Sequence, residues 1–207
     1  MKGEGLLFVV SAPSGTGKSS LCNRVISEVE QLTRSVSYTT RPPRSYEKNG
    51  IDYHFISQEE FEKRKKEGGF LEWAEVYGHL YGTLWRDLQS IVQSGRDAIL
   101  AIDVQGAMRV KELAKEVVMI FIVPPSLNDL KTRMKGRGDD NSQGEIKRRL
   151  EGAPGEISQA KEYNYLILNE QFDQAVDQLK AIIKAERCRV SRVLHLLDLN
   201  RFENSEP

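Results

Sequence analysis

The sequence predicts an α/β domain built on a parallel sheet, because short apolar runs alternate along it with helical patterns. Each run is continuous rather than alternating, which is typical of strands that are buried on both faces. At 207 residues, the chain fits one domain with room for a small insertion. The predicted strands cover residues 6–10, 98–103, 117–123 and 165–169.

Helices are predicted where apolar residues recur every three or four positions. Leu21, Val25 and Val29 follow this spacing and predict a helix over about 18–31, shortly after the first strand. A second helix is expected around 86–93. The last begins near residue 172, and its apolar face consists of Val176, Leu179, Ile182 and Ile183.

A segment of different character interrupts this alternation between residues 33 and 82. It is rich in glycine, proline and aromatic residues, and it contains short extended pieces such as DYHFIS and FLEWAEVYGHLYG. Between these pieces, Ser57 and Glu60 form a capping box, which predicts a short charged helix that ends at Gly68 and Gly69. We expect a small mixed sheet inserted into the main fold.

Composition narrows the class of protein. Thirty basic and thirty acidic residues give no net charge, which argues against a nucleic-acid-binding protein. The apolar run at residues 6–10 is too short for a signal peptide or a membrane span. Cys22 and Cys188 lack the spacing of a metal site, so we expect free thiols. A cytoplasmic protein without nucleic-acid or membrane partners is the expectation.

The loop between the first strand and the first helix carries the strongest functional motif. In SAPSGTGKSS, Ala12 stands where phosphate-binding loops of the form G-x-x-x-x-G-K-[ST] have their first glycine. Alanine fits there if its φ is negative, and glycines remain in the tight part of the loop. Lys18 would reach the terminal phosphates, and the Ser19 hydroxyl would bind Mg²⁺. The predicted phosphate-binding residues are Ala12, Pro13, Ser14, Gly15, Thr16, Gly17, Lys18 and Ser19.

Asp103 ends the second predicted strand and has two possible roles. A carboxylate at this point often supports the Mg²⁺ shell in proteins with such a loop. It could equally cap the helix that follows. The sequence leaves both roles open.

The inserted segment holds candidates for binding a second substrate. Arg41 and Arg44 flank two prolines that restrict the backbone, and two guanidinium forks suit a phosphate monoester. A solvated basic turn is the alternative. Glu72 lies among apolar neighbours, where a carboxylate could accept both the N1–H and the 2-amino group of guanine. A surface carboxylate or an internal ion pair is the alternative there.

Taken together, these segments resemble guanylate kinase. The blocks SAPSGTGKSS, SVSYTTRPPR, NGIDYHF, FLEWAEVYGHLYGT, ILAIDVQGA and RMKGRGDD occur in the order and spacing of that family over nearly the whole chain. An alanine at the start of the loop is normal in the family. The resemblance implies a three-layer fold of the P-loop NTPase type, with the insertion binding GMP and a helical lid. It also implies transfer of the γ-phosphoryl group of ATP to GMP, and to dGMP, with Mg²⁺ as cofactor.

The resemblance implies domain limits and residue roles. The kinase-like domain would span 5–187, with the GMP-binding insertion at about 34–83, the lid at about 134–148 and a polar tail at 188–207. Thr83 stands where many relatives have serine, and Ala101 replaces an acidic residue found in some. The residues expected to bind GMP are Ser37, Glu72 and Thr83 at the base, Arg41, Arg44, Tyr53 and Tyr81 at the phosphate, and Asp103 near the metal.

The expected lid is rich in arginine. Arg133 and Arg137 are four residues apart, so they share one helix face, and Arg148 lies beyond a loop rich in glycine and aspartate. We expect Arg133 and Arg137 to bind ATP, and Lys18, Arg41, Arg137 and Arg148 to act in catalysis. Whether Arg149 joins Arg148 is left open.

The residues argue against two alternative functions. Some guanylate-kinase-like domains bind peptides in membrane-associated scaffolds and have lost catalysis, but they typically lack a working phosphate loop. A kinase for another nucleoside monophosphate is the second alternative, and Ser37 and Glu72 argue against it because they suit guanine. Oligomeric state and the choice of donor nucleotide are not predicted.

Overall fold

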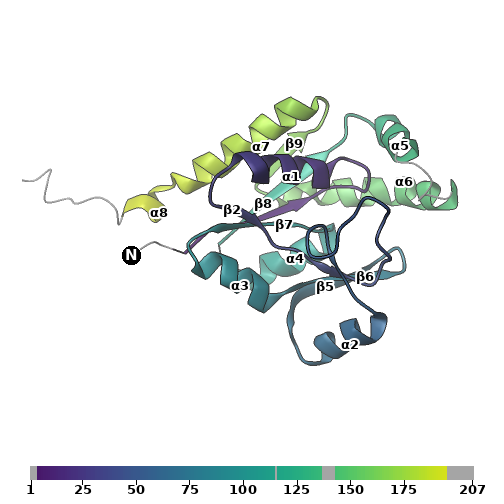
Figure 1. Ribbon diagram of the computed structural model, residues 1–207. Coiled ribbons are helices and arrows are strands. Elements are labelled where there is room, and N and C mark those ends of the chain that lie inside the picture. Colours follow the sequence, from purple (N-terminus) through teal and green to yellow (C-terminus); the bar gives the residue numbers. More distant parts are fainter. Residues whose placement is uncertain (1–3, 115, 137–142, 195–207) are drawn as a thin grey trace, which may run out of the picture.

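The chain forms two sheets in a computed structural model that describes residues 4–114, 116–136 and 143–194 (Figure 1). The larger sheet is parallel throughout its five strands, in the order β2-β7-β1-β8-β9. This confirms the predicted α/β fold with a parallel core. Its strands are β1 (Leu7–Ser11), β2 (Leu32–Arg34), β7 (Asp97–Ala101), β8 (Val117–Val123) and β9 (Tyr165–Leu168).

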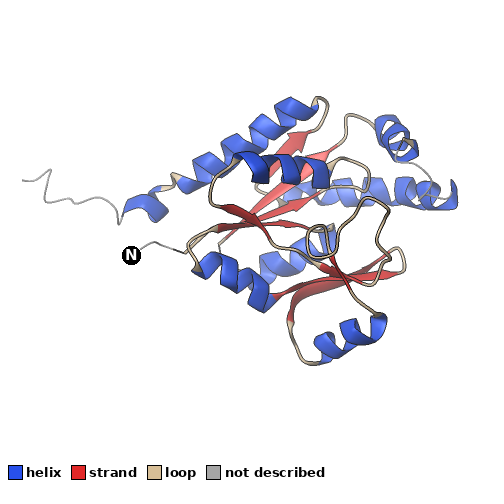
Figure 2. Cartoon of the chain, viewed as in Figure 1, coloured by secondary structure: helices blue, strands red, loops and turns tan. Residues whose placement is uncertain are grey.

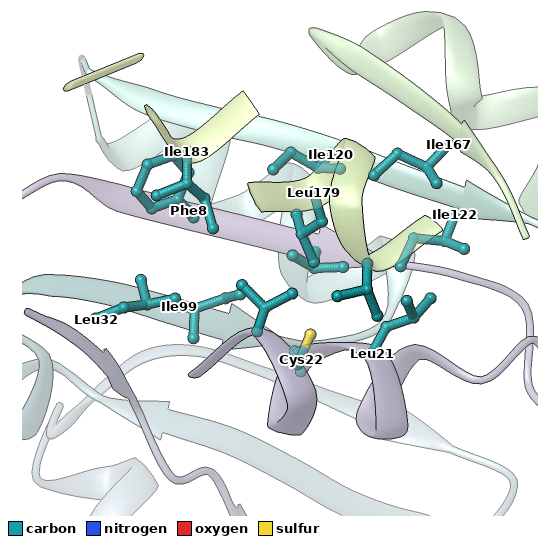
Figure 3. Close-up of a cluster of buried hydrophobic side chains, with 14 of the residues drawn as sticks. Phe8, Leu21, Cys22, Leu32, Ile99, Ile120, Ile122, Ile167, Leu179 and Ile183 are labelled. Atoms are coloured by element: carbon teal, nitrogen blue, oxygen red, sulfur yellow. The ribbon is translucent and has the colours of Figure 1, made fainter. Parts of the chain in front are cut away.

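Helices cover both faces of this sheet (Figures 1 and 2). One face packs against α1 (Lys18–Glu28) and α7 (Phe172–Arg187), and the other against α3 (Trp85–Gln93) and α4 (Val104–Leu113). Because neighbouring residues of a strand point to opposite faces, Phe8 joins the first core and Val9 the second. Figure 3 shows the first core, where Leu21 and Leu179 meet the sheet.

The predicted insertion is a separate sheet of four short strands in the order β4-β3-β6-β5. It is mixed, since β3 runs parallel to β4 and antiparallel to β6. Ser57 accepts a hydrogen bond from the Glu60 amide (3.1 Å) and starts α2 (Gln58–Lys66), which confirms the predicted N-cap, while the Glu60 side chain accepts from Arg64 (2.8 Å). The strands are β3 (Tyr38–Thr39), β4 (His54–Phe55), β5 (Phe70–Val76) and β6 (His79–Leu84).

The core strands match their predicted positions within one or two residues, but the edge strand β2 was not predicted. It has three residues and pairs with β7 from Leu32↔Asp97 onward. The first helix ends at Glu28 instead of continuing to residue 31. Gln31 adopts a positive φ of 61°, which no helix continues through, and this turn directs the chain into β2.

The chain leaves the core sheet after β8 as two helices, α5 (Leu127–Lys135) and α6 (Gln143–Ser158). They pack on each other through Leu130, Met134 and Ala153. Residues 137–142 of the expected lid, which include Arg137, lie outside the described residues. A 3₁₀ turn (Gln159–Glu162) leads into β9, and α8 (Val190–Val193) follows α7. Across the described helices, none combines the length and apolar character needed to cross a membrane.

Candidate active site

A cleft opens where the core sheet, the small sheet and α6 come together. Its walls come from the phosphate loop after β1, the turn between β7 and α4, the inner face of the small sheet and one side of α6. The cleft therefore lies at the carboxyl ends of two adjacent parallel strands, the usual position of ligand sites in open α/β sheets. Most of the predicted site residues line this one cleft.

The loop of residues 12–19 has the curl that phosphate binding requires. Gly15 and Gly17 take φ values of 91° and 99°, which side chains with a Cβ rarely adopt. Ala12 is buried and does not have a positive φ, so alanine is tolerated there as predicted. The loop closes through a hydrogen bond from the Thr16 amide to the Pro13 carbonyl (3.1 Å) and opens into the N-terminus of α1.

Lys18 lies half-buried at the base of the cleft. Its ammonium group donates to the Ile102 carbonyl at 2.5 Å, close to the Asp103 carboxylate. Burial lowers the pKa of Lys18, and the neighbouring negative charge of Asp103 opposes that shift. An anionic ligand in the cleft would add further negative charge and favour the ammonium form.

Asp103 takes the capping role that the sequence left open, and it also lines the cleft. Its Oδ1 accepts hydrogen bonds from the amides of Gln105 (2.8 Å) and Gly106 (3.2 Å) at the start of α4. Both amide bonds reach the same oxygen, so the cap fixes the carboxylate at the edge of the cleft. Capping and a part in metal binding are compatible at this residue.

The three residues predicted to bind guanine form one chain of hydrogen bonds. Thr83 donates to Glu72 Oε1 at 2.7 Å, and the Thr83 and Ser37 hydroxyls lie 3.3 Å apart. All three are buried, and Glu72 is 3% exposed. Burial raises the pKa of Glu72 to about 7, and the hydrogen bond from Thr83 opposes only part of that shift. A buried carboxylate with a free oxygen favours a ligand that offers donors.

Gly106 makes room for this carboxylate. A Cβ at this position would lie 2.5 Å from Glu72 Oε2, closer than side-chain carbons approach other atoms. Gly106 is buried in the first turn of α4, directly beside the Asp103 cap. The absence of a side chain at this point therefore sets how closely α4 can pack on the Glu72 strand.

The predicted arginine pair is held by a carboxylate that was not predicted. Arg41 donates to both oxygens of Glu47 at 2.8 Å, and the Arg44 amide donates to Glu47 at 2.9 Å. Arg41 also lies over the rings of Tyr53 and Phe55, at 5.6 and 5.8 Å. Arg41, Arg44, Tyr53 and Tyr81 all line the cleft. The alternative of a solvated basic turn does not fit Arg41, whose side chain is 12% exposed.

Arg133 contacts the phosphate loop from outside the cleft. Its guanidinium donates to the carbonyls of Thr16 (3.3 Å) and Asn169 (2.9 Å), while the Asn169 amide donates to the same Thr16 carbonyl (2.6 Å). Arg133 does not line the cleft. Asn169 follows β9 and was not predicted, because a lone asparagine after a strand carries no motif.

Of the two adjacent arginines on α6, Arg149 is the one that lines the cleft. It donates to the Ser14 hydroxyl at 3.2 Å and to Glu145 at 2.9 Å. Its buried Nε has no hydrogen-bond partner among the described residues. Arg148 lies over the ring of Tyr77 at 5.0 Å and not in the lining. Sequence alone could not choose between them, because which of two adjacent helical residues faces the cleft depends on how the helix is rotated about its axis.

Glu156 is a further carboxylate in the cleft that the sequence did not single out. Burial raises its pKa to about 7, and the nearby Lys18 opposes that shift. It lies two residues after Pro154, inside α6, and nothing in its local sequence distinguishes it from Glu145 and Glu151 of the same helix.

The donor groups of the cleft suit Mg²⁺ bound largely through a ligand. The described residues contain no group of three or more His, Cys, Asp or Glu side chains that could hold an ion alone. The exposed Ser19 hydroxyl and the Asp103 carboxylate both face the cleft. Mg²⁺ favours sites in which the protein supplies few oxygen ligands and phosphates and water fill the remaining coordination positions.

Comparisons with known proteins point in one direction. The family model described as guanylate kinase matches residues 5–186. A guanylate kinase from Geobacter metallireducens is 50% identical over 203 residues, which is 98% of this chain and 99% of the relative. A guanylate kinase from Thermotoga maritima is 44% identical over 93% of this chain and 91% of its own. The crystal structure of guanylate kinase from Anaplasma phagocytophilum superposes with a TM-score of 0.81 at 36% identity, covering 99% of both chains.

Proposed function

The chain belongs to the guanylate kinase family, and from that premise we propose how its cleft holds the two nucleotides and moves the phosphoryl group. The protein is a guanylate kinase: it transfers the γ-phosphoryl group of ATP to GMP and yields ADP and GDP. Use of dGMP is part of the proposal, since no contact assigned below requires the ribose 2′-hydroxyl.

The acceptor base binds at the end of the cleft where Glu72 is buried. One Glu72 oxygen accepts a hydrogen bond from the Thr83 hydroxyl. The carboxylate thereby accepts from the guanine N1–H and 2-amino groups in the proposed complex. Ser37 and Thr83 complete the polar surface with two hydroxyls. Adenine lacks this pair of adjacent donors, so it would leave a buried carboxylate unsatisfied. The buried Glu72–Thr83–Ser37 chain is the observation that carries the choice of guanine.

The GMP phosphate binds between Arg41, Arg44, Tyr53 and Tyr81. Glu47 already holds the Arg41 fork and the Arg44 amide in place before any ligand arrives, and the Arg44 guanidinium lies 3.7 Å from the same carboxylate. Two guanidinium groups and two phenol hydroxyls suit the oxygens of a phosphate monoester. Preorganisation of this kind reduces the entropy lost when the ligand binds.

The ATP phosphates bind at the loop of residues 12–19, where backbone amides and the N-terminus of α1 favour anions. Lys18 leaves the Ile102 carbonyl and binds the terminal phosphates, and Ser19 would hold Mg²⁺. Asp103, which lines the same cleft, would contact the hydration shell of that ion. Mg²⁺, when bound with ATP, neutralises phosphate charge during transfer. Arg133 approaches ATP from the outer side of the loop. Arg137 lies outside the described residues and stays a predicted residue for ATP binding and catalysis.

Transfer depends on alignment and charge neutralisation. A GMP phosphate oxygen is a nucleophile at neutral pH, so the reaction requires no general base. Lys18, Arg41 and Arg149 come from three separate segments and line the same cleft. Fixed positive charges placed there stabilise the migrating phosphoryl group, which is the main catalytic contribution that a protein makes to this chemistry. Arg148 stays a predicted catalytic residue.

The acceptor assignment is tested by a coupled assay of ADP release with GMP, dGMP, AMP, CMP and UMP as acceptors. We expect turnover with GMP and dGMP and at least a hundredfold lower kcat/KM with the other three, because none of their bases offers two adjacent donors to the buried carboxylate. Comparable turnover with AMP would contradict the role given to Glu72. A cytoplasmic location stays part of the proposal, and the free thiols of Cys22 and Cys188 fit a reducing compartment.

A further inference from the structure

The hairpin between β5 and β6 contains an unexpected residue at its tip. Val76 pairs with His79, so Tyr77 and Gly78 form a two-residue loop, and both have positive φ values, 52° and 82°. Such turns prefer Asn, Asp or Gly at the first position, because a Cβ is strained there. A bulky tyrosine in the left-handed region therefore costs stability locally. Such strain persists only where a contact of the side chain with another part of the fold compensates for it.

The Tyr77 ring makes that contact with α6. The guanidinium carbons of Arg148 and Arg149 lie 5.0 and 5.3 Å from its centroid, within the range of cation–π attraction. Its hydroxyl lies near Gly152, where an added Cβ would be 3.6 Å away, and it interacts with the Glu156 carboxyl. One side chain of the small sheet thus touches three successive turns of α6.

The contact between Tyr77 and Arg149 connects the small sheet with the phosphate loop. Arg149 is held by Tyr77 from one side and by Glu145 from its own helix, and it reaches Ser14 of the phosphate loop. Tyr77 and Arg149 both line the cleft. The unpaired buried Nε of Arg149 leaves a donor available to a ligand in the cleft.

We propose that Tyr77 is a positioning residue: its ring, on the sheet that binds the acceptor, holds Arg149 of α6 against the phosphate loop, in place to neutralise the phosphoryl group. This inference rests on the proposed role of Arg149 in transfer. The acceptor-binding sheet thereby influences the charge at the donor phosphates through one aromatic side chain. Tyr77 itself touches no reacting atom in this scheme.

A purely structural role for Tyr77 makes the opposite prediction about stability. If the ring served the fold alone, replacing it would destabilise the protein. The Tyr77→Asn variant gives the turn its preferred residue and removes the ring, so we expect an equal or higher Tm together with lower activity. Gln31→Asn is the matched control, because Gln31 also has a positive φ but lies far from the cleft residues, in the turn before β2.

The test combines steady-state kinetics with a double-mutant cycle on the full chain. We expect Tyr77→Asn to lower kcat about tenfold, the size of losing a desolvated cation–π contact, with the Kd for GMP alone changed by less than about twofold. Tyr77→Phe keeps the ring and should retain kcat within about threefold. In the Arg149→Ala background, Tyr77→Asn should cause little further loss, since the two residues act as a unit.

A Tyr77→Asn enzyme with wild-type kcat would overturn the proposal, and so would effects of Tyr77→Asn and Arg149→Ala that multiply fully. A wild-type chain that fails to phosphorylate GMP would refute the proposed function instead, and it would be detected before any variant is measured. A Tyr77→Asn protein with a clearly lower Tm than wild type would assign the ring to the fold and contradict the positioning role.

Discussion

The two nucleotide sites proposed for this enzyme are built in different ways. The donor phosphate loop is a contiguous stretch, residues 12–19, whose shape comes from backbone angles at Gly15 and Gly17. The acceptor base site is assembled from side chains of Ser37, Glu72 and Thr83, which come from separate segments. Backbone amides recognise phosphate in any nucleotide, whereas a buried side chain can distinguish one base from another. The donor loop can therefore bind the phosphates of any nucleotide, whereas the acceptor sheet can select one base.

The acceptor site carries the cost of a buried carboxylate. The carboxyl pKa of Glu72 is raised from 4.5 to about 7. Keeping this group ionised in the empty protein above pH 7 therefore costs on the order of 3 kcal/mol. Guanine donors would relieve that cost on binding, whereas a ligand without them would not. The buried charge thus contributes to selectivity because it is unfavourable when unpaired.

The largest effect is expected at the donor loop. Lys18→Ala removes the charge closest to the terminal phosphates, and we expect kcat to fall by about 10² to 10³, as for other fixed charges that act in the transition state. Lys180→Ala is the control, because that lysine pairs with Glu28 on the surface. Near-normal turnover of Lys18→Ala in the ADP-release assay would refute the assignment.

This loop is also the part of the site that sequence predicts best. Its residues are contiguous, its glycines mark the required backbone angles, and its flanking strand and helix are visible as hydrophobic patterns. The tolerance of Ala12 follows from the sign of a single φ angle. Local sequence determines local backbone shape, so the prediction requires no knowledge of the tertiary structure.

The acceptor carboxylate should show the next largest effect. Glu72→Gln replaces an acceptor of two hydrogen bonds by an amide that leaves one guanine donor unpaired, so we expect kcat/KM for GMP to fall about 10- to 100-fold. The KM for ATP should stay within about twofold. Glu75→Gln, on the same strand but exposed, is the matched control. An equal loss for both substrates would place Glu72 outside the base site.

Gly106→Ala tests the same site without changing its chemistry. The new Cβ would lie 2.5 Å from Glu72 Oε2 and force the carboxylate to shift, so we expect the KM for GMP to rise about tenfold. Gly155→Ala is the control, since that helical glycine has nothing within 4 Å of an added Cβ. Calorimetry with GMP alone would measure the change directly, and unchanged affinity would show that the packing of α4 on Glu72 is not needed for binding.

The acceptor site also contains most of what the sequence could not predict. The family resemblance assigned Glu72, but Gly106 and Arg149 act through contacts with residues far away in the chain. Glu47 binds neighbours in the chain, yet it does so through the fold of an irregular turn. Their importance depends on how α4, the arginine turn and α6 pack around the cleft. Spacing along one sequence carries no signal for such contacts.

A change of pH should have an effect on the KM for GMP no larger than that of Gly106→Ala, and it again separates the two sites. Because the pKa of Glu72 in the empty protein is about 7, its carboxyl is largely neutral below that pH and cannot accept both guanine donors. We expect the KM for GMP to rise about tenfold as pH falls from 8 to 6, while the KM for ATP changes less. The GMP phosphate itself titrates near pH 6, so the profile must be compared with that of Glu72→Gln.

In that comparison the phosphate titration is common to both proteins and cancels. The wild-type profile should be steeper than that of Glu72→Gln, and the difference should centre on pH 7. Stability gives an independent check with the opposite sign: the folded protein binds the Glu72 proton more tightly than the unfolded chain, so this group lowers the free energy of unfolding as pH rises from 4.5 to 7. Parallel pH profiles for the two proteins would mean that Glu72 is already ionised in the empty site, and the selectivity argument from buried charge would fail.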